Sequence, residues 1–188
     1  VYKRQHDPNN YKSKGKLVKA RGIEVGHIFH FGQKYSVPMN ASVSDGQGKN
    51  ISAYMGSYGV GLSRLVGAVI EANHDKDGIV WPKEVTPWDY HIINLKSGDQ
   101  NCDQTCSNLY KIMKENSLSV LYDDTDERAG AKLAKADLIG LPCQILIGPR
   151  GVKDKLFDVK YRKSGDVSKL SYNQLINFLN IKKTSTIL

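Results

Sequence analysis

The sequence predicts an α/β (α+β) chain in two parts: an antiparallel strand pair that leads into a helix, then a mostly parallel mixed sheet flanked by helices. Three observations predict this fold. β-Branched and aromatic residues dominate residues 18–35, apolar residues recur at helical spacing over residues 61–73, and strand and helix patterns alternate after Pro87. With 188 residues, 40% of them hydrophobic, the chain can form one ordinary domain or two small ones.

The first part of the chain begins with a polar, Lys-rich stretch at residues 1–19, which we expect to be a loop or disordered tail. Ordered structure is expected from about Val18, with strand character up to Tyr35. Pro38 and the Gly-, Ser- and Asn-rich residues 44–50 then predict a long hairpin connection. The elements expected after it are a strand at 51–55 and a helix at about 61–73.

The second part follows a candidate linker at residues 83–88, bracketed by prolines at 82 and 87. The linker would separate the end of a first domain, residues 20–82, from a second domain at residues 89–188. Elements in the second domain alternate in βαβαβ order, which favours parallel strands covered by helices. The expected strands are 90–95, 118–122, 143–147 and 156–161, and the expected helices are about 100–116, 127–138 and 171–180.

The charge of the chain says little about its partners. The formal net charge is +8, but residues 1–21 hold seven Lys or Arg against one Asp and carry +6 of it, which leaves about +2 for the rest. The basic composition is therefore weak support for a folded RNA-binding face. No apolar run approaches the roughly 20 residues that span a bilayer, and no signal peptide is recognisable, so we expect a cytosolic protein.

The three cysteines fit no disulfide framework, which favours a reduced compartment. Cys102 and Cys106 lie one turn apart on an expected helix and are spaced to share a metal ion. No nearby His or Cys completes four ligands, so we expect ordinary packing and no metal.

A glycine-rich turn at residues 56–64 is the most informative motif. The glycines separate a predicted strand from a predicted helix, and Arg64 lies in the first helical turn. Free amides at a helix N-terminus and a nearby guanidinium favour phosphate or carboxylate. From Gly59 the spacing reads G-x-G-x-x-R, which fits neither the dinucleotide fingerprint nor the P-loop.

This motif resembles motif 3 of the class II aminoacyl-tRNA synthetases, in which an arginine contacts ATP. Residues 21–36, RGIEVGHIFHFGQKYS, resemble a strand-and-turn signature of the bacterial-type prolyl-tRNA synthetases. Residues 123–132, DDTDERAGAK, followed by ADLIGLP at 136–142, are similar to the anticodon-binding domain of several class II enzymes. The three blocks occur in the family's order, so the chain resembles the C-terminal portion of a prolyl-tRNA synthetase.

The resemblance implies an enzyme that uses ATP with Mg²⁺ to activate proline and then transfers it to the proline tRNA. It also implies a homodimer. No segment resembles motifs 1 and 2, so we expect an incomplete catalytic sheet and little activity from this chain alone. Two alternatives remain: a non-catalytic RNA-binding module derived from a synthetase, and a relative that charges threonine or glycine.

In the first domain, the resemblance implies that Glu24, His27 and Arg64 contact ATP and that Phe29 lines the proline pocket. Strict alternation along a strand places Glu24 and His27 on opposite faces, so we expect a bulge at Gly26 to bring them together. The alternatives are that His27 is structural, that Phe29 is core packing, and that Arg64 is solvated or pairs with Glu71. We also assign the amino-acid side of the pocket to Gly59, Gly61 and Ser36.

In the second domain, the resemblance implies that Asp123, Asp124, Arg128 and Lys132 bind the anticodon. Carboxylates can accept from guanine N–H groups, and the two cations, one turn apart, are expected to share a face toward base or phosphate. The alternative is an acidic helix N-terminus with solvated cations. A basic run at residues 150–163 is expected to be a solvated hairpin rather than an RNA surface.

Overall fold

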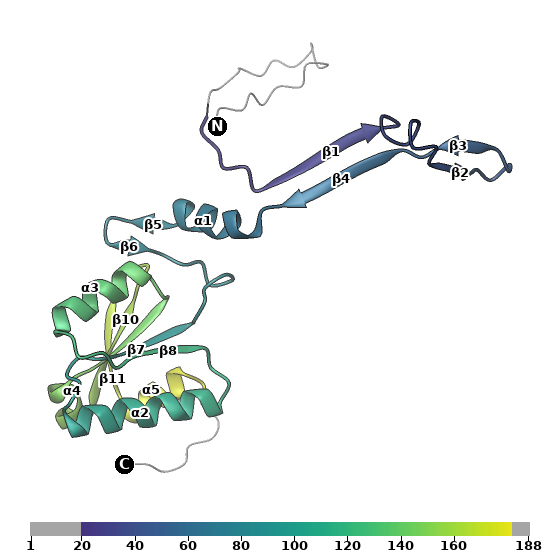
Figure 1. The fold of residues 1–188 in the computed structure, drawn as a ribbon. Coiled ribbons are helices and arrows are strands. Elements are labelled where there is room, and N and C mark those ends of the chain that lie inside the picture. Colours follow the sequence, from purple (N-terminus) through teal and green to yellow (C-terminus); the bar gives the residue numbers. More distant parts are fainter. Residues whose placement is uncertain (1–19, 182–188) are drawn as a thin grey trace, which may run out of the picture. The chain divides into compact units, whose positions relative to one another are not determined.

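The computed structural model describes residues 20–181, and its contacts divide the chain into two compact units after Ala68 (Figure 1). The boundary falls inside helix α1, Leu62–Ala72. The tail predicted at residues 1–19 lies outside the described residues. Each unit is described by itself below.

The first unit is built on an antiparallel pair, β1 (Gly26–Gly32) with β4 (Met55–Val60). Between them lies a small antiparallel hairpin, β2 (Ser42–Ser44) with β3 (Asn50–Ser52). The Asp45 carboxylate closes this hairpin by accepting bonds from the amides of Gln47 and Lys49, both 2.9 Å long. The predicted antiparallel pair and helix are therefore present, but the strand expected at 51–55 is two strands, and the later one pairs with β1.

The second unit contains a five-stranded mixed sheet with strand order β11-β10-β9-β7-β8. β7 is parallel to both β8 and β9, whereas β10 is antiparallel to β9 and β11. This confirms a mixed sheet flanked by helices, with two parallel and two antiparallel strand pairings. The strands are β7 (Tyr90–Asn94), β8 (Val120–Asp123), β9 (Cys143–Ile147), β10 (Leu156–Tyr161) and β11 (Val167–Ser171).

Helices cover both faces of this sheet (Figure 1). α3 (Ala129–Ile139) lies on one face, and α2 (Gln100–Glu115), α4 (Pro149–Asp154) and α5 (Tyr172–Phe178) lie on the other. Local sequence fixes where helices start: the Asp99 carboxylate accepts from two amides at the start of α2, and Ser171 forms a capping box with Gln174 at α5. Neither α4 nor β11 was expected from the sequence.

The apolar core lies between the sheet and helices α2 and α5. Both Cys102 and Cys106 are buried on that side of α2, and burial raises the pKa of the Cys106 thiol to about 12, so it stays protonated. The buried core residues are Ile92, Cys106, Leu109, Met113, Val120, Cys143, Ile145, Ile147, Phe157, Val159, Leu175 and Leu179.

The opposite face carries a polar row in register across three strands: His91 and Gln144, which are buried, and Lys160, which is partly exposed. Asp137 of α3 accepts bonds from Lys160 Nζ at 2.7 Å and from Gln144 Nε2 at 3.0 Å. Burial raises the pKa of Asp137, but these two donors outweigh it, and the pKa lies below its usual value. Among the described residues, His91 Nδ1 and Gln144 Oε1 are buried without a hydrogen-bond partner.

A short hairpin, β5 (His74–Asp75) with β6 (Gly78–Ile79), packs against the end of α3. The backbones of β6 and of Gly140, at the end of α3, lie so close that a Cβ at Gly140 would be 1.9 Å from the carbonyl oxygen of Ile79. Trp81 Nε1 donates to the carbonyl of Ile139 at 2.9 Å. The Arg162 guanidinium donates one hydrogen bond to each carboxylate oxygen of Asp75. Residues 74–81 therefore pack on the end of α3 and on Arg162 of the second unit, ahead of the linker predicted at 83–88.

Candidate functional site

A small pocket in the first unit collects five of the residues that the sequence assigned to substrate binding. Its volume is about 220 Å³, and it lies where β1 begins and β4 ends. The lining residues are Glu24, Val25, Gly26, His27, Gly59, Val60, Gly61 and Arg64. Residues that are 30 to 40 positions apart in the sequence thus meet at one place.

Arg64 is fixed at this pocket by a backbone contact. Its Nη1 donates to the carbonyl of Glu24 at 2.8 Å, and within the described residues this bond replaces the alternative pairing with Glu71. The amide of Gly61 donates to the carbonyl of Val25 at 2.9 Å. This amide was expected to be free for an anion, and it is not. The guanidinium is the cationic group that the pocket offers.

His27 and Glu24 meet as expected, with 2.7 Å between His27 Nδ1 and Glu24 Oε1. The expected cause is wrong, because β1 and β4 stay in register from Gly26 to His30 and the irregularity lies between His30 and Gly32. Glu24 instead precedes β1, so the alternation of a strand does not apply to it. The contact positions an imidazole beside a carboxylate at the mouth of the pocket.

Phe29 and Ser36 do not line this pocket. The Phe29 ring stacks on His27 at 4.0 Å between centroids, and it remains 46% exposed, so it is not buried in a core of the described residues. Ser36 is fully buried, and its hydroxyl donates to the carbonyl of Gln33 at 3.3 Å. Its assignment to the amino-acid side stays a prediction.

The second candidate site lies at the carboxyl ends of β7 and β8. The chain leaves β7 toward α2 on one face and leaves β8 toward α3 on the other, so the two following loops diverge (Figure 1). Such a divergence is where α/β sheets bind ligands. Asp124 and Arg128 are both exposed in the loop after β8, and the Arg128 side chain makes no capping bond to α3.

Asp123 and Lys132 lie inside the domain at the same place. Lys132 is fully buried and Asp123 is 8% exposed. The expectation that Arg128 and Lys132 share an outward face is therefore wrong. The Lys132 ammonium points inward and donates to the carbonyl of Asn94, 2.7 Å away. Burial raises the pKa of Asp123, but two bonds from Thr125 and the charge of Lys132 outweigh it and hold the pKa below its usual value.

Sequence reasoning missed the partners of Lys132. Ser97 Oγ accepts from Lys132 at 3.0 Å and donates to the carbonyl of Thr125 at 2.8 Å. The available signal was a polar Ser-Gly-Asp stretch directly after a predicted strand, at the same sheet edge as Asp123.

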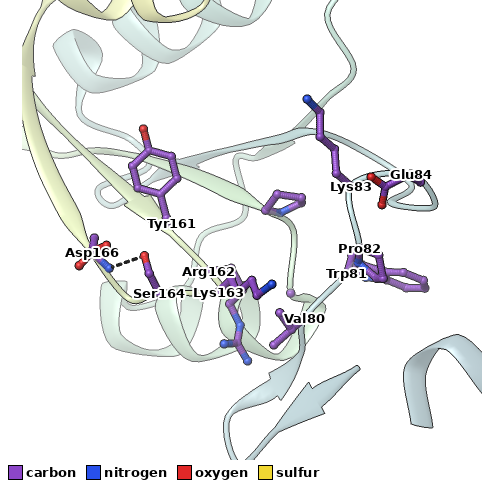
Figure 2. Close-up of a pocket in the computed structure, with 12 residues that line it drawn as sticks. Val80, Trp81, Pro82, Lys83, Glu84, Tyr161, Arg162, Lys163, Ser164 and Asp166 are labelled. Carbon is purple, nitrogen blue, oxygen red and sulfur yellow. Dashed lines mark hydrogen bonds between the residues drawn. The ribbon is translucent and has the colours of Figure 1, made fainter. Parts of the chain in front are cut away.

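The basic run at residues 150–163 is not one solvated hairpin. Lys160 and Arg162 are held in ion pairs with Asp137 and Asp75. A pocket of about 790 Å³ lies beside Arg162, with Trp81 and Pro82 on one side and Tyr161 on the other (Figure 2). It lies where β9 begins and β10 ends, at the end of the sheet opposite to the one that carries Asp124 and Arg128.

The sequence of residues 89–182 matches the family described as "Anticodon binding domain". The chain belongs to the anticodon-binding domain family. The matched residues contain the whole five-stranded sheet of the second unit, so this sheet with its helices is the anticodon-binding domain. The match confirms the fold and the family that the sequence predicted for this half.

Bacterial relatives extend the similarity to the first unit. The chain is 48% identical over 176 residues to a protein of Caulobacter vibrioides named "Proline--tRNA ligase", an alignment that covers 94% of this chain and 40% of the relative. Relatives with the same name from Rhodospirillum rubrum and Parvibaculum lavamentivorans are 50% and 52% identical, over 91% and 89% of this chain and 39% of each relative. The chain thus spans about 40% of the length of these curated relatives.

No helix within residues 20–181 combines the length and apolar character needed to cross a membrane.

Proposed function

We propose that this chain is the C-terminal part of a proline–tRNA ligase. The complete protein would activate proline with ATP and transfer it to the proline tRNA during translation in the cytoplasm. The observation that carries the proposal is the identity of about 50% over nine-tenths of the chain. An alignment of that extent must include the first unit as well as the anticodon-binding domain.

Activation brings the proline carboxylate in line with the α-phosphate of ATP, so positioning and charge stabilisation are the main tasks of the protein. We assign the phosphate contact to Arg64, whose guanidinium is already oriented by the Glu24 carbonyl. Glu24 and His27 form the second part of the ATP contact. At about 220 Å³ the pocket is smaller than sites that enclose a whole ligand, so these residues would hold one part of ATP.

Mg²⁺ would enter with the phosphates of ATP. Within residues 20–181 no group of three or more His, Cys, Asp or Glu side chains is placed to hold a metal ion. Mg²⁺ commonly binds through substrate phosphates with few protein ligands.

We propose that Phe29, Gly59 and Gly61 form one wall of the proline pocket and that Ser36 belongs to the same amino-acid side. The rest of the site would come from other strands of the complete protein. The exposure of the β1–β4 pair supports this: Ile28, Tyr58 and Val60 are 72%, 79% and 67% exposed. A two-stranded sheet is marginal by itself, so such side chains are expected to be covered in the whole enzyme, which we propose is a homodimer.

We propose that Asp124 and Arg128 contact the anticodon loop of the proline tRNA. Loop bases are unstacked, and proteins read them by bonds to their edges and by stacking on aromatic or guanidinium planes. A carboxylate that accepts from guanine N–H groups and an exposed guanidinium four residues later in the same loop supply both kinds of contact. Asp123 and Lys132 would act from inside the domain.

The test is proline-dependent ATP–pyrophosphate exchange by the complete protein, measured with proline, threonine and glycine in parallel. We expect exchange with proline and none above background with the other two. Exchange driven by threonine or glycine would identify a related ligase. Tight tRNA binding with no exchange for any of the three would identify a non-catalytic tRNA-binding module.

A further inference from the structure

Lys132 lies at the point where the two loops of the candidate anticodon site leave the sheet. It belongs to α3, yet its side chain is fully buried. Its Nζ donates to the Asn94 carbonyl at 2.7 Å and to Ser97 Oγ at 3.0 Å, and it lies 3.5 Å from Asp123 Oδ1. Three oxygens therefore surround a group that has three donors.

These contacts close a ring that joins the loop at residues 95–99 to the loop at residues 124–128. Ser97 Oγ donates to the Thr125 carbonyl at 2.8 Å. The amide and hydroxyl of Thr125 both donate to Asp123 Oδ1, at 3.0 and 2.6 Å. Asp123 then pairs with Lys132, so each loop is held by the other and by α3.

The loop at residues 95–99 is also fixed from the side of α2. Asn94 Oδ1 accepts from the amide of Lys96 at 3.0 Å, and Asn94 Nδ2 donates to Asp103 Oδ1 at 2.7 Å. The other oxygen of Asp103 accepts from the amide of Gly98 at 3.2 Å. Lys132 thus connects a loop that is already ordered by α2 to the loop that carries Asp124 and Arg128.

A buried ammonium is tolerated only where its charge and its donors are matched. At Lys132 they are matched by oxygens of Asn94, Ser97 and Asp123, at the ends of β7 and β8 and in the loop after β7, which leaves no donor to offer to RNA. We propose that Lys132 is a positioning residue that sets the distance between the two loops and thereby the placement of Arg128. The inference deepens the proposed anticodon function and rests on it for its effect on RNA.

The test compares Lys132→Met in the 188-residue chain with Lys111→Met, which removes the same charge from an exposed position on α2. Hydrogen exchange of the amides at 95–99 and 124–128 should become about tenfold or more faster in Lys132→Met, because a bond network to a charged group is lost. The same amides should be unaffected in Lys111→Met. Ser97→Ala, which breaks two bonds of the ring without a change of charge, should give a smaller increase.

The RNA measurement is the affinity for an anticodon stem-loop of the proline tRNA at several salt concentrations. If Lys132 is a positioning residue, Lys132→Met should lower the affinity by about tenfold without changing the dependence of affinity on salt. If Lys132 instead touches phosphate, its removal should lower the slope of log affinity against log salt concentration by about 0.7 to 0.9. A slope that falls by this amount in Lys132→Met would overturn the proposal.

Unchanged loop exchange in both Lys132→Met and Ser97→Ala would also overturn it. If Lys132→Met does not fold, Ser97→Ala alone decides by the same exchange measurement. If the wild-type chain binds no RNA, the anticodon function fails, whereas the exchange result still decides whether Lys132 braces the loops.

Discussion

Gly140→Ala should destabilise the second unit much more than Gly165→Ala, although both glycines have a φ of +76°. Any Cβ at this φ costs about 1 to 2 kcal/mol in left-handed backbone strain, and both variants carry that cost. At Gly165 nothing lies within 4 Å of the new Cβ. At Gly140 the Cβ would lie 1.9 Å from the Ile79 carbonyl oxygen, so the β5–β6 hairpin must move away from α3.

The extra cost follows from the bonds that this movement breaks. Trp81 Nε1 donates to Ile139 O at 2.9 Å, and the Trp81 amide donates to Gly140 O at 3.3 Å. Each bond contributes about 1 kcal/mol. Gly140→Ala should therefore lower the free energy of unfolding by about 3 to 4 kcal/mol, against about 1 to 2 kcal/mol for Gly165→Ala.

The assay is urea unfolding of the wild-type chain and both variants, followed by far-UV circular dichroism and by tryptophan fluorescence. Trp81 and Trp88, the two tryptophans of the chain, both lie in the second unit, so fluorescence reports on it. Equal costs for the two variants would contradict this prediction, because they would mean that the contact of β6 with α3 contributes nothing.

Three further predictions concern the proposed ATP site and the buried histidine. In the complete protein, Arg64→Ala should slow proline-dependent ATP–pyrophosphate exchange by on the order of 100-fold, and Arg64→Lys should also be impaired because lysine lacks the bidentate fork; exchange at the wild-type rate would remove Arg64 from the site. The isolated 188-residue chain should show no such exchange, because we propose that the rest of the site comes from other strands of the complete protein. A rate comparable to that of the complete protein would contradict this. Burial lowers the pKa of His91 from 6.5 to about 4. Between these pH values the unfolded state binds more protons than the folded state does. The free energy of unfolding should therefore fall by up to about 3 kcal/mol as the pH drops from 6.5 to 4. Urea unfolding of wild type and His91→Gln across this range checks it, and parallel pH profiles would contradict it.

Where local sequence decides structure, prediction succeeded. β9 and β10 have the bounds that were expected from their apolar and β-branched composition, and α1 ends within one residue of its predicted bounds. β11 and α4 were missed because each is short: α4 has six residues that begin with a proline, and β11 alternates weakly. Their bounds depend on pairing with β10 and on the turn at Lys155, which no local pattern encodes.

The candidate sites show the same limit. The sequence could place Asp123 and Lys132 at one edge of the sheet, but whether a lysine faces solvent or the interior depends on its acceptors. Those acceptors, Asn94 and Ser97, lie 38 and 35 residues away in the sequence. Likewise, Glu24 and His27 met for a different reason than expected, because the start of β1 is set by its pairing with β4.

The most direct test of the proposed anticodon function is binding of the 188-residue chain to a proline tRNA and to tRNAs that differ from it only in the anticodon. The wild type should prefer the proline anticodon, and Arg128→Ala should lose about 1 to 3 kcal/mol of binding together with that preference. Arg150→Ala, which removes the same charge from an exposed position on α4, should retain the preference. If wild type and Arg128→Ala bind every tRNA equally well, the anticodon role assigned to the loop after β8 is contradicted.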